Sequence, residues 1–228
     1  MKRNSLAGFT LIEMLVVIAI IAVLAAFAVP ALTNALARGQ MTGTMNNARQ
    51  LYLATFQMAT DGATNSDPNL SWPGDDTTLA AGASLKDFCQ KLLQNDYLKA
   101  GDIQKILNAP GANCTATADT ATPPNLTLTG TSALKVYKVK ESDSSNTIFA
   151  VSSNYIYNAV PAANAAPYGD KGFVVVRKGG DASTFRKNQS TVANYGNDAN
   201  KFQGTIGKLT ADTDGTVGTE GGKILTQP

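Results

Sequence analysis

The feature that most constrains this chain is an apolar run of nineteen residues, Met14–Leu32, without a charged or hydrogen-bonding side chain. A helix rises about 1.5 Å per residue, so this run covers nearly the whole hydrocarbon core of a bilayer, which is about 30 Å thick. A helix in a soluble domain needs an apolar stripe rather than an apolar surface all round. The run therefore predicts a transmembrane segment near the N-terminus.

The residues before the run carry charges in a defined order. Lys2 and Arg3 are the only charges ahead of Glu13, so the positive-inside tendency predicts a cytoplasmic N-terminus. Glu13 stands next to the apolar run, where a carboxylate is costly without a partner. A short basic leader that ends in Gly8 and is followed by Phe9 places a processing point ahead of the apolar run.

The basic leader, the segment up to Glu13 and the apolar helix behind it together resemble the N-terminus of type IV pilins and of the pseudopilins of type II secretion. The resemblance covers roughly Gly8 to Leu36 and is only architectural beyond that. It implies that a prepilin peptidase cuts after Gly8 and methylates the new amine of Phe9. The essential Glu of the family, the fifth residue of the mature chain, corresponds to Glu13, and its helix-breaking Pro corresponds to Pro30.

Glu13 also has a physical role that does not depend on the resemblance. Cleavage between Gly8 and Phe9 would create a positive amine, which Glu13 of a neighbouring copy could neutralise, and this pair would fix the axial register of the packed helices. The alternative is a Glu13 side chain that only reaches the lipid headgroups. Pro30 removes one helical hydrogen bond at a cost of about 3 kcal/mol, so we expect it to kink the helix. Stretching or melting at Pro30 is implied only by the resemblance.

The helical pattern continues beyond the apolar run. Apolar residues recur in steps of three to five, which predicts one stripe on a continuous helix: Leu32, Leu36, Met41, Met45, Ala48, Tyr52, Phe56 and Ala59. Asp61 and Gly62 predict the end of this helix, with Gly62 as a left-handed cap. The chain therefore divides into four expected regions: a leader over 1–8, a transmembrane assembly helix over 9–32, its amphipathic continuation over 33–61 and a globular domain over 62–228.

Composition narrows the function further. Lys and Arg total 19 against 17 Asp and Glu, and loss of Lys2 and Arg3 with the leader would bring the two totals level, which argues against nucleic acid as a partner. The sequence holds no His. This excludes Ser-His-Asp and Cys-His catalysis, and no other catalytic set is visible, so we do not expect an enzyme.

The two cysteines are Cys89 and Cys114. They are too few for a four-ligand zinc site. In an exported domain such a pair predicts a disulfide bond, and the alternative is two free thiols. Twenty-four residues lie between the two cysteines, so a bridge would stabilise the fold by about 3–4 kcal/mol on the chain-entropy model.

The globular region begins with an irregular loop. Its Trp72, the only Trp in the chain, is expected to anchor the loop to the core, although an exposed adhesive contact is the alternative. Ser84, with Asp87 three residues later, predicts a capped helix start, and a second, shorter helix follows. This assignment places Cys89 on a helix and Cys114 on the loop beyond the helical pair.

Strand signals follow the two helices. Five segments are rich in β-branched, aromatic or alternating apolar residues: 126–129, 134–140, 147–152, 154–157 and 173–176. The second and third predict a hairpin, and Phe173–Val176 predicts the central strand. In the Gly-rich C-terminal region, Thr205–Leu209 and Lys223–Leu225 are candidates for short strands. The expected fold is α+β and pilin-like, with a long N-terminal helix packed on one antiparallel sheet and a short αα unit between them.

Asp212 and Asp214 are the candidate metal ligands. Aligning the EF-hand template on Gly215 puts Thr210 in first place and Gly221 in twelfth, so both key acids of that motif are missing. Some major pseudopilins hold calcium near the C-terminus, and this resemblance leaves Asp212 and Asp214 as candidate calcium ligands. The alternative is a solvated Asp-Gly turn. We expect no other cofactor.

The sequence thus predicts a structural subunit. The expected precursor is cut after Gly8, held in a bacterial inner membrane as a single pass with a periplasmic globular domain, and assembled as a helical homo-oligomer through its N-terminal helix. The implied partners are prepilin peptidase, the inner-membrane assembly machinery and the bilayer. The sequence does not decide between a type IV pilus and a secretion pseudopilus.

Two other classes also stay open. One is a secreted protein cut by signal peptidase near Ala26-Phe27-Ala28, in which Glu13 would have no role. The other is a membrane-anchored binding module that never polymerises.

Overall fold

The computed structural model describes residues 10–79 and 82–228, which divide into two compact units with the boundary between Arg38 and Gly39. A single helix, α1 (Leu11–Asn65), contributes to both units. In the first unit every described side chain from Thr10 to Leu36 is exposed. By length and composition, α1 is able to cross a membrane. The second unit, residues 39–228, is called the head below.

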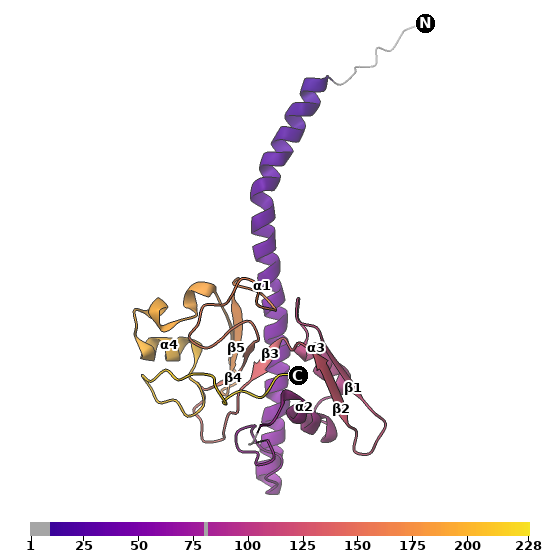
Figure 1. The fold of residues 1–228 in the computed structure, drawn as a ribbon, viewed down its shortest axis with the longest axis vertical. Helices are drawn as coiled ribbons and strands as arrows, with labels where there is room; N and C mark the ends of the chain where they lie inside the picture. The colour runs from indigo at the N-terminus through magenta and orange to yellow at the C-terminus, as the bar shows by residue number, and fades with distance from the viewer. Residues whose placement is uncertain (1–9, 80–81) are drawn as a thin grey trace. The chain divides into compact units, whose positions relative to one another are not determined.

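The head contains both helices and antiparallel sheets (Figure 1). In chain order the elements after α1 are α2 (Leu85–Gln94), α3 (Ala100–Leu107), β1 (Cys114–Ala118), β2 (Leu126–Gly130), β3 (Leu134–Val136), β4 (Ile148–Ser152), β5 (Phe173–Arg177), β6 (Ala182–Phe185), the 3-10 helices η1 (Lys187–Gln189) and η2 (Val192–Tyr195), and α4 (Ala199–Ile206). β1 pairs with β2, and β3-β4-β5-β6 form a second sheet in that order. The predicted α+β fold is confirmed, but its strands form two sheets rather than one.

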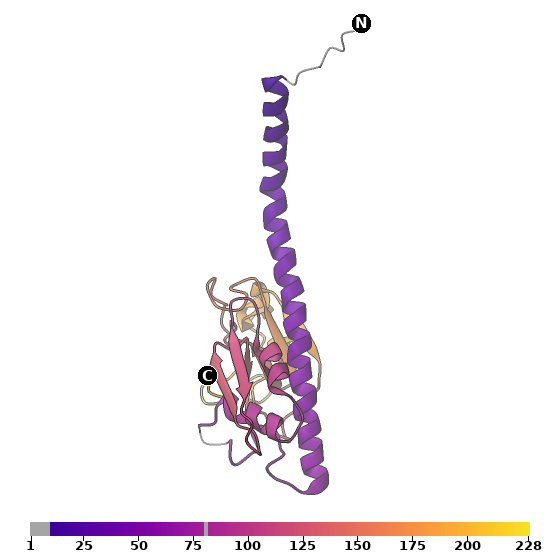
Figure 2. The ribbon, with the colours of Figure 1, turned by 90° about the vertical axis from the view of Figure 1, so that its right-hand side faces the viewer.

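Within the head, the second half of α1 runs along one side of both sheets (Figure 2). Its buried positions follow the helical period: Met41, Thr44, Ala48, Leu51, Tyr52, Ala54, Thr55, Met58 and Gly62. The predicted stripe shared three of these positions, but Phe56 is 49% exposed, and Leu32 and Leu36 are exposed in the first unit. Two threonines were missed because they are polar. The hydroxyl of Thr55 donates to the carbonyl of Leu51 at 2.8 Å, which removes the cost of burying it.

The long helix does not end at Gly62 as predicted. α1 continues to Asn65, and the left-handed residue is Ser66, with φ 56°. Gly62 is instead the point where the following loop comes closest to the helix. A Cβ on Gly62 would lie 1.7 Å from the carbonyl oxygen of Leu70, so only glycine fits here. The amide of Asp67 donates to the carbonyl of Gly62 at 2.9 Å and turns the chain back along α1.

Aromatic side chains join α1 to the larger sheet. Tyr52 of α1 and Trp72 of the following loop both pack edge-on against Phe149 of β4, with ring centroids 5.9 and 6.0 Å apart. Trp72 is only 3% exposed, which confirms the prediction that it anchors the loop. β5 lies between β4 and β6, and its residues Phe173–Val176 are buried, as expected for the central strand. One hydrophobic core therefore joins α1 to this sheet, and it also includes buried residues of α2, α3 and the β1–β2 hairpin.

The start of α2 is as predicted. The hydroxyl of Ser84 accepts from the amide of Asp87 at 3.2 Å, and the Asp87 carboxylate accepts from the amide of Ser84 at 3.0 Å. This reciprocal capping box satisfies two backbone donors that a helix leaves open. Cys89 lies on α2 as expected, but Cys114 opens β1 instead of lying in a loop.

Several strand predictions were wrong. The segment 134–140 is a strand only to Val136, and 154–157 forms turns. Thr205–Leu209 begins inside α4, and Lys223–Leu225 contributes only a single bridge between Ile224 and Tyr137. In each case a loop or helix satisfies the backbone groups that a strand ladder would have paired.

The β1–β2 hairpin has an exposed tip with its own hydrogen bonds. One carboxylate oxygen of Asp119 accepts from the amides of Ala121 and Asn125 at 3.1 and 2.8 Å. Ala116 and Leu128 on the inner side of the hairpin are buried, whereas the alternate residues along both strands are exposed. The hairpin is therefore anchored from one face and closed at its tip by local contacts.

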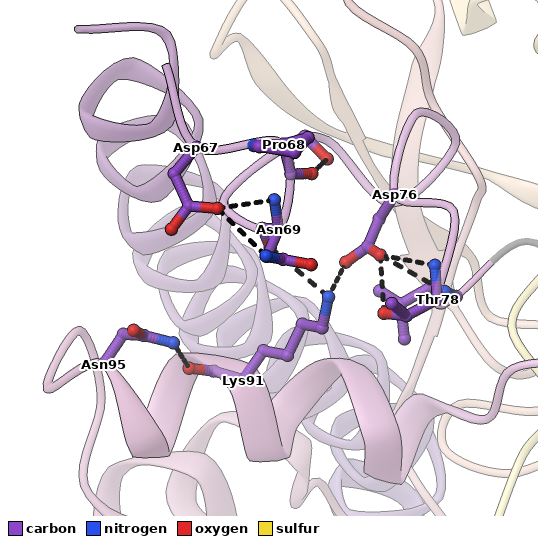
Figure 3. A network of polar contacts seen from close by, with 9 residues as sticks. Asp67, Pro68, Asn69, Asp76, Thr78, Lys91 and Asn95 are labelled. Atoms are coloured by element: carbon purple, nitrogen blue, oxygen red, sulfur yellow. Dashed lines mark hydrogen bonds and ion pairs between the residues drawn. The ribbon is translucent and has the colours of Figure 1, made fainter. Parts of the chain in front are cut away.

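A polar network ties the loop after α1 to α2 (Figure 3). Lys91 of α2 pairs with Asp76, whose side chain is fully buried, and Thr78 donates to the same carboxylate through its amide at 2.9 Å and its hydroxyl at 2.6 Å. The Lys91 ammonium also donates to the carbonyl of Asn69 at 3.3 Å. Asp67 accepts from the amide of Asn69 at 2.9 Å, which stabilises a turn in this loop. Lys91 therefore binds the loop at two points, the carbonyl of Asn69 and the carboxylate of Asp76.

This network predicts an acid-sensitive contribution to stability. Burial alone would raise the pKa of Asp76, but hydrogen bonds from Lys91 and Thr78 outweigh it and hold the pKa below its usual value of 3.8. Because the folded-state pKa is lowered, the ionised carboxylate stabilises the head above the pKa of the unfolded chain. That contribution is lost as the pH falls through the folded-state pKa. We expect Asp76→Asn to lower the free energy of unfolding by about 2 kcal/mol at neutral pH.

The measurement is urea unfolding of the full chain in detergent, with Trp72 fluorescence as the readout. It is repeated at a series of pH values from neutral to below the usual carboxyl pKa. The difference between wild type and Asp76→Asn should shrink as the pH falls below the usual carboxyl pKa. Asp96→Asn, at an exposed position, is the matched control and should behave like the wild type. A difference that stays constant with pH would show that the Asp76 charge is not involved.

Candidate assembly site

The candidate site begins at the N-terminal end of α1. Glu13 accepts two hydrogen bonds from Thr10 on its Oε2 atom, from the backbone amide at 2.8 Å and from the hydroxyl at 2.7 Å. The amide of Glu13 donates in return to the Thr10 hydroxyl at 3.3 Å. This is a capping box at the start of the long helix. Glu13 was a predicted site residue, but Thr10 was not. The Thr-x-x-Glu spacing is the sequence signal of this capping box.

The capping box leaves part of the Glu13 carboxylate unused. Both hydrogen bonds to the side chain reach Oε2, and Oε1 has no partner in the part of the chain that the structure describes. Glu13 therefore stabilises its own helix through Oε2 alone. Gly8 and Phe9, the predicted cleavage and methylation positions, lie outside the described residues.

The surface behind Glu13 is apolar on all sides of the helix. Leu11 is 83% exposed, Phe27 78% and Leu24 64%. Leu24 and Phe27 share one face of α1 because they are three residues apart, and Leu11 lies on the opposite side. Such a surface is stable only against lipid or against other apolar helices. α1 continues through Pro30, and the hydroxyl of Thr33 donates to the Pro30 carbonyl at 3.0 Å. The kink at Pro30 stays a prediction.

Comparison with known families decides the character of this segment. The family model for the prokaryotic N-terminal methylation motif matches residues 3–29, a range that contains Gly8, Phe9 and Glu13. The N-terminus is of the prepilin type. The motif match and the geometry agree, because the prepilin-type segment presents an acid at the head of an exposed apolar helix.

Curated relatives that match this chain are fimbrial proteins. The type IV major fimbrial protein FimA of Dichelobacter nodosus is 39% identical over 75 residues, which cover 33% of this chain and 48% of that protein. The fimbrial protein EcpC of Eikenella corrodens is 38% identical over 85 residues, 37% of this chain and 51% of that protein. A probable minor fimbrial protein of D. nodosus is 46% identical over 57 residues, 25% of this chain and 36% of that protein.

These similarities are confined to a part of each protein. The chain spans about half the length of FimA and of EcpC. No solved structure matches the chain significantly. The resemblance to type IV pilins is therefore confirmed through the N-terminal motif and the fimbrial relatives, and the head is described from its own residues.

The two cysteines belong to one hydrophobic core. Cys89 of α2 is fully buried and Cys114 of β1 is 2% exposed. Both are free thiols in this structure. Burial raises the pKa of the Cys89 thiol, and the nearby Cys114 raises it further. Burial also raises the pKa of Cys114. Both thiols are therefore held protonated at neutral pH, and the predicted disulfide bond stays a prediction.

Export into an oxidising compartment is part of the function proposed below. In such a compartment we expect Cys89 and Cys114 to form a disulfide bond, because the two residues share one core. After denaturation without reductant, iodoacetamide should then add no label, and with reductant it should add a label at both positions. Reduction should lower the free energy of unfolding by about 3 kcal/mol.

The variant Cys114→Ser is the control, since it leaves a single thiol that must be labelled in both conditions. Labelling of both cysteines in the unreduced wild type would contradict the bridge.

The candidate calcium ligands do not form a cation site. Asp212 accepts from Lys223 at 2.5 Å and from the amide of Gly218 at 2.9 Å. Asp214 pairs with Lys208 at 3.0 Å. Calcium needs six to eight oxygen ligands, and no group of three or more acidic or sulfur ligands occurs in residues 10–79 and 82–228. The donors present do not fit calcium, because each carboxylate is already neutralised by a lysine.

Proposed function

We propose that this chain is the precursor of a structural filament subunit, cut after Gly8 by a prepilin peptidase, methylated on Phe9 and assembled through α1. The observation that carries the proposal is the combination of the motif over residues 3–29 with a fully exposed apolar helix behind Glu13. Copies of such a helix bury one another's apolar surface. Because each copy makes the same head-to-tail contact, the assembly is an open helix.

The proposal assigns a role to each region of the chain. Residues 1–8 are the leader, 9–32 the segment held in the inner membrane before assembly, 33–61 its continuation and 62–228 the periplasmic domain that becomes the outer surface. The free Oε1 atom of Glu13 supports the pairing with the amine of Phe9 on a neighbouring subunit. Prepilin peptidase and the inner-membrane assembly machinery are the other partners, and the subunit is not an enzyme.

Between the two kinds of filament, we favour a type IV pilus over a secretion pseudopilus. The relatives reported above are named as fimbrial proteins. Their similarity covers only part of each protein, so the outer surface of the filament and its function are specific to the head of this chain.

Mass spectrometry of the mature N-terminal peptide tests the proposal. Protein from membranes and from sheared filaments should yield a peptide that starts at Phe9 and carries one methyl group on its amine. Gly8→Val, which places a bulky side chain at the cleavage position, should leave the leader attached. A mature chain that starts at Val29 would instead identify a signal-peptidase substrate, and an intact Met1 on assembled protein would remove the proposed processing.

A further inference from the structure

A cavity of about 320 Å³ lies in the head between three segments that are far apart in the sequence. Its walls are the turn at Pro73-Gly74, the stretch after β3 that contains Lys138 and Lys140, and the C-terminal loop around Thr210 and Lys223. Sites for small molecules usually measure about 300–1,000 Å³. The cavity is therefore large enough for a small solute.

The lining of the cavity is positively charged. Lys138, Lys140 and Lys223 all contribute to it, and none of the lining residues is acidic. Lys138 is half-buried and Lys140 is exposed, and neither forms an ion pair within the described residues. Lys223 pairs with Asp212, which lies outside the lining. Lys138 and Lys140 are therefore the two lysines of the lining that have no ion-pair partner among the described residues.

The acids beside the cavity are engaged in holding its walls together. Asp143 accepts from the amide of Lys140 at 2.8 Å and from the hydroxyl of Thr210 at 2.7 Å. Asp212 accepts from Lys223 and from the amide of Gly218. These carboxylates fix the position of the lysine-bearing segments and leave the ammonium groups of Lys138 and Lys140 without a counter-ion.

Backbone contacts make the cavity a built feature of the fold. The amide of Lys138 donates to the carbonyl of Lys223 at 2.7 Å, and the amide of Gly74 donates to the carbonyl of Val139 at 2.8 Å. A Cβ on Gly74 would lie 2.3 Å from the carbonyl oxygen of Lys138, so this close approach requires glycine. The three walls are thus joined to one another, and the lysines project from a fixed backbone.

We propose that this cavity binds a small solute that carries a phosphate or sulfate group, with Lys138, Lys140 and Lys223 as its cationic ligands. Lysines are ordinarily spread over solvated surface, but like charges gathered around a concave site raise the local potential and attract anions. Lysine binds phosphate as a point charge with several donors. The volume also leaves room for an organic group attached to the anion. This site does not depend on filament assembly.

The test is a titration of the full chain in detergent, with the midpoint of thermal unfolding followed by Trp72 fluorescence. The probes are inorganic phosphate, glucose 6-phosphate and glucose, at an ionic strength held constant with sodium chloride. Phosphate should raise the midpoint with a saturable dependence that chloride does not reproduce. The double variant Lys138→Gln/Lys140→Gln should weaken the apparent affinity about tenfold, whereas Lys138→Arg/Lys140→Arg should retain it.

The matched control is Lys86→Gln/Lys105→Gln, which removes the same charge from exposed positions on α2 and α3 and should bind like the wild type. Equal affinity for the two phosphates supports the site as one for the inorganic anion, and tighter binding of glucose 6-phosphate supports it as one for a phosphate carried on a larger solute. The proposal is overturned if phosphate has no effect beyond that of chloride, if glucose alone gives the same rise, or if the control variant loses as much affinity.

Discussion

Replacing Glu13 by alanine is expected to remove filaments while leaving the protein in the membrane. In the proposed assembly, the carboxylate neutralises the amine of a neighbouring subunit within an apolar bundle. Loss of one partner of a buried ion pair costs about 3–5 kcal/mol. Since each 1.4 kcal/mol is about a factor of ten in an equilibrium constant, the subunit contact should weaken more than a hundredfold. Electron microscopy of cells and immunoblots of sheared and membrane fractions measure the two populations.

The capping box makes it possible to separate the two roles of Glu13. Glu13→Gln keeps an acceptor for Thr10 but removes the charge, so it should lose filaments as Glu13→Ala does. Thr10→Ala removes the capping hydroxyl, at a cost of about 1 kcal/mol to the helix start, but keeps the charge, so filaments should persist. Glu141→Ala, at a position 78% exposed in the head, is the control for loss of an acid. Wild-type filaments from Glu13→Ala would show that the Glu13 carboxylate is not needed for the subunit contact.

The second large effect is expected at Glu220, which fastens the C-terminal loop to the sheet. Its carboxylate pairs with Lys135 at 2.8 Å and accepts from the hydroxyl of Tyr137 at 2.6 Å and the amide of Tyr157 at 2.9 Å. The side chains of Lys135 and Glu220 are only 8% and 13% exposed. Glu220→Ala would leave a nearly buried ammonium without a counter-ion, and we expect it to lower the free energy of unfolding by about 3–5 kcal/mol.

The pH dependence of the Glu220→Ala variant follows from the lysine it leaves behind. Burial lowers the pKa of Lys135 from its usual 10.5, and Glu220 opposes this shift. Without Glu220 the folded-state pKa falls further, so the unfolded chain binds more protons over the interval between the two values. Stability then rises with pH through that interval, and the deficit of Glu220→Ala should narrow under alkaline conditions.

Urea unfolding followed by Trp72 fluorescence measures the loss. The double variant Glu220→Ala/Lys135→Met should recover a large part of the stability, because no charge is then buried without a partner. A loss of less than about 1 kcal/mol in the single variant, the range of exposed ion pairs, would show that water reaches this pair freely.

The N-terminal half of the fold could be predicted because its signals are local. An unbroken apolar run, an acid at a fixed distance from a basic leader and a Ser84–Asp87 capping pair each act within a few residues. The β-branched strand Phe173–Val176 was equally clear, because a fully buried strand is apolar at every position.

The parts that were missed depend on contacts between distant segments. α4 contains Gly204 and Thr205, which are poor helix formers, and it is stabilised by the burial of Phe202 and Ile206 and by a cap from Asp198 to the amide of Lys201 at 3.1 Å. The sequence predicts a helix end at Gly62. The contact that actually requires glycine there is the close approach of Leu70, a residue outside the helix.

The candidate site was predicted in part. The position of Glu13 beside the apolar run predicts a functional role, whereas its hydrogen bonds with Thr10 are local to the helix start and were not predicted. Calcium binding stays a prediction, and the sequence could not show that Lys208 pairs with Asp214 and Lys223 with Asp212.

The β1–β2 hairpin has a practical consequence for engineering. It forms a sheet separate from β3-β4-β5-β6. Its tip is closed by hydrogen bonds between Asp119 and Asn125, and Gln94 of α2 donates to the carbonyl of Pro124 at 3.1 Å. A foreign peptide inserted between Asp119 and Asn125 would lengthen the β1–β2 hairpin. It would not shift the register of β3, β4, β5 or β6, because these strands belong to the other sheet. On a polymer built from many copies, such a graft would become a dense, regular array of the same epitope.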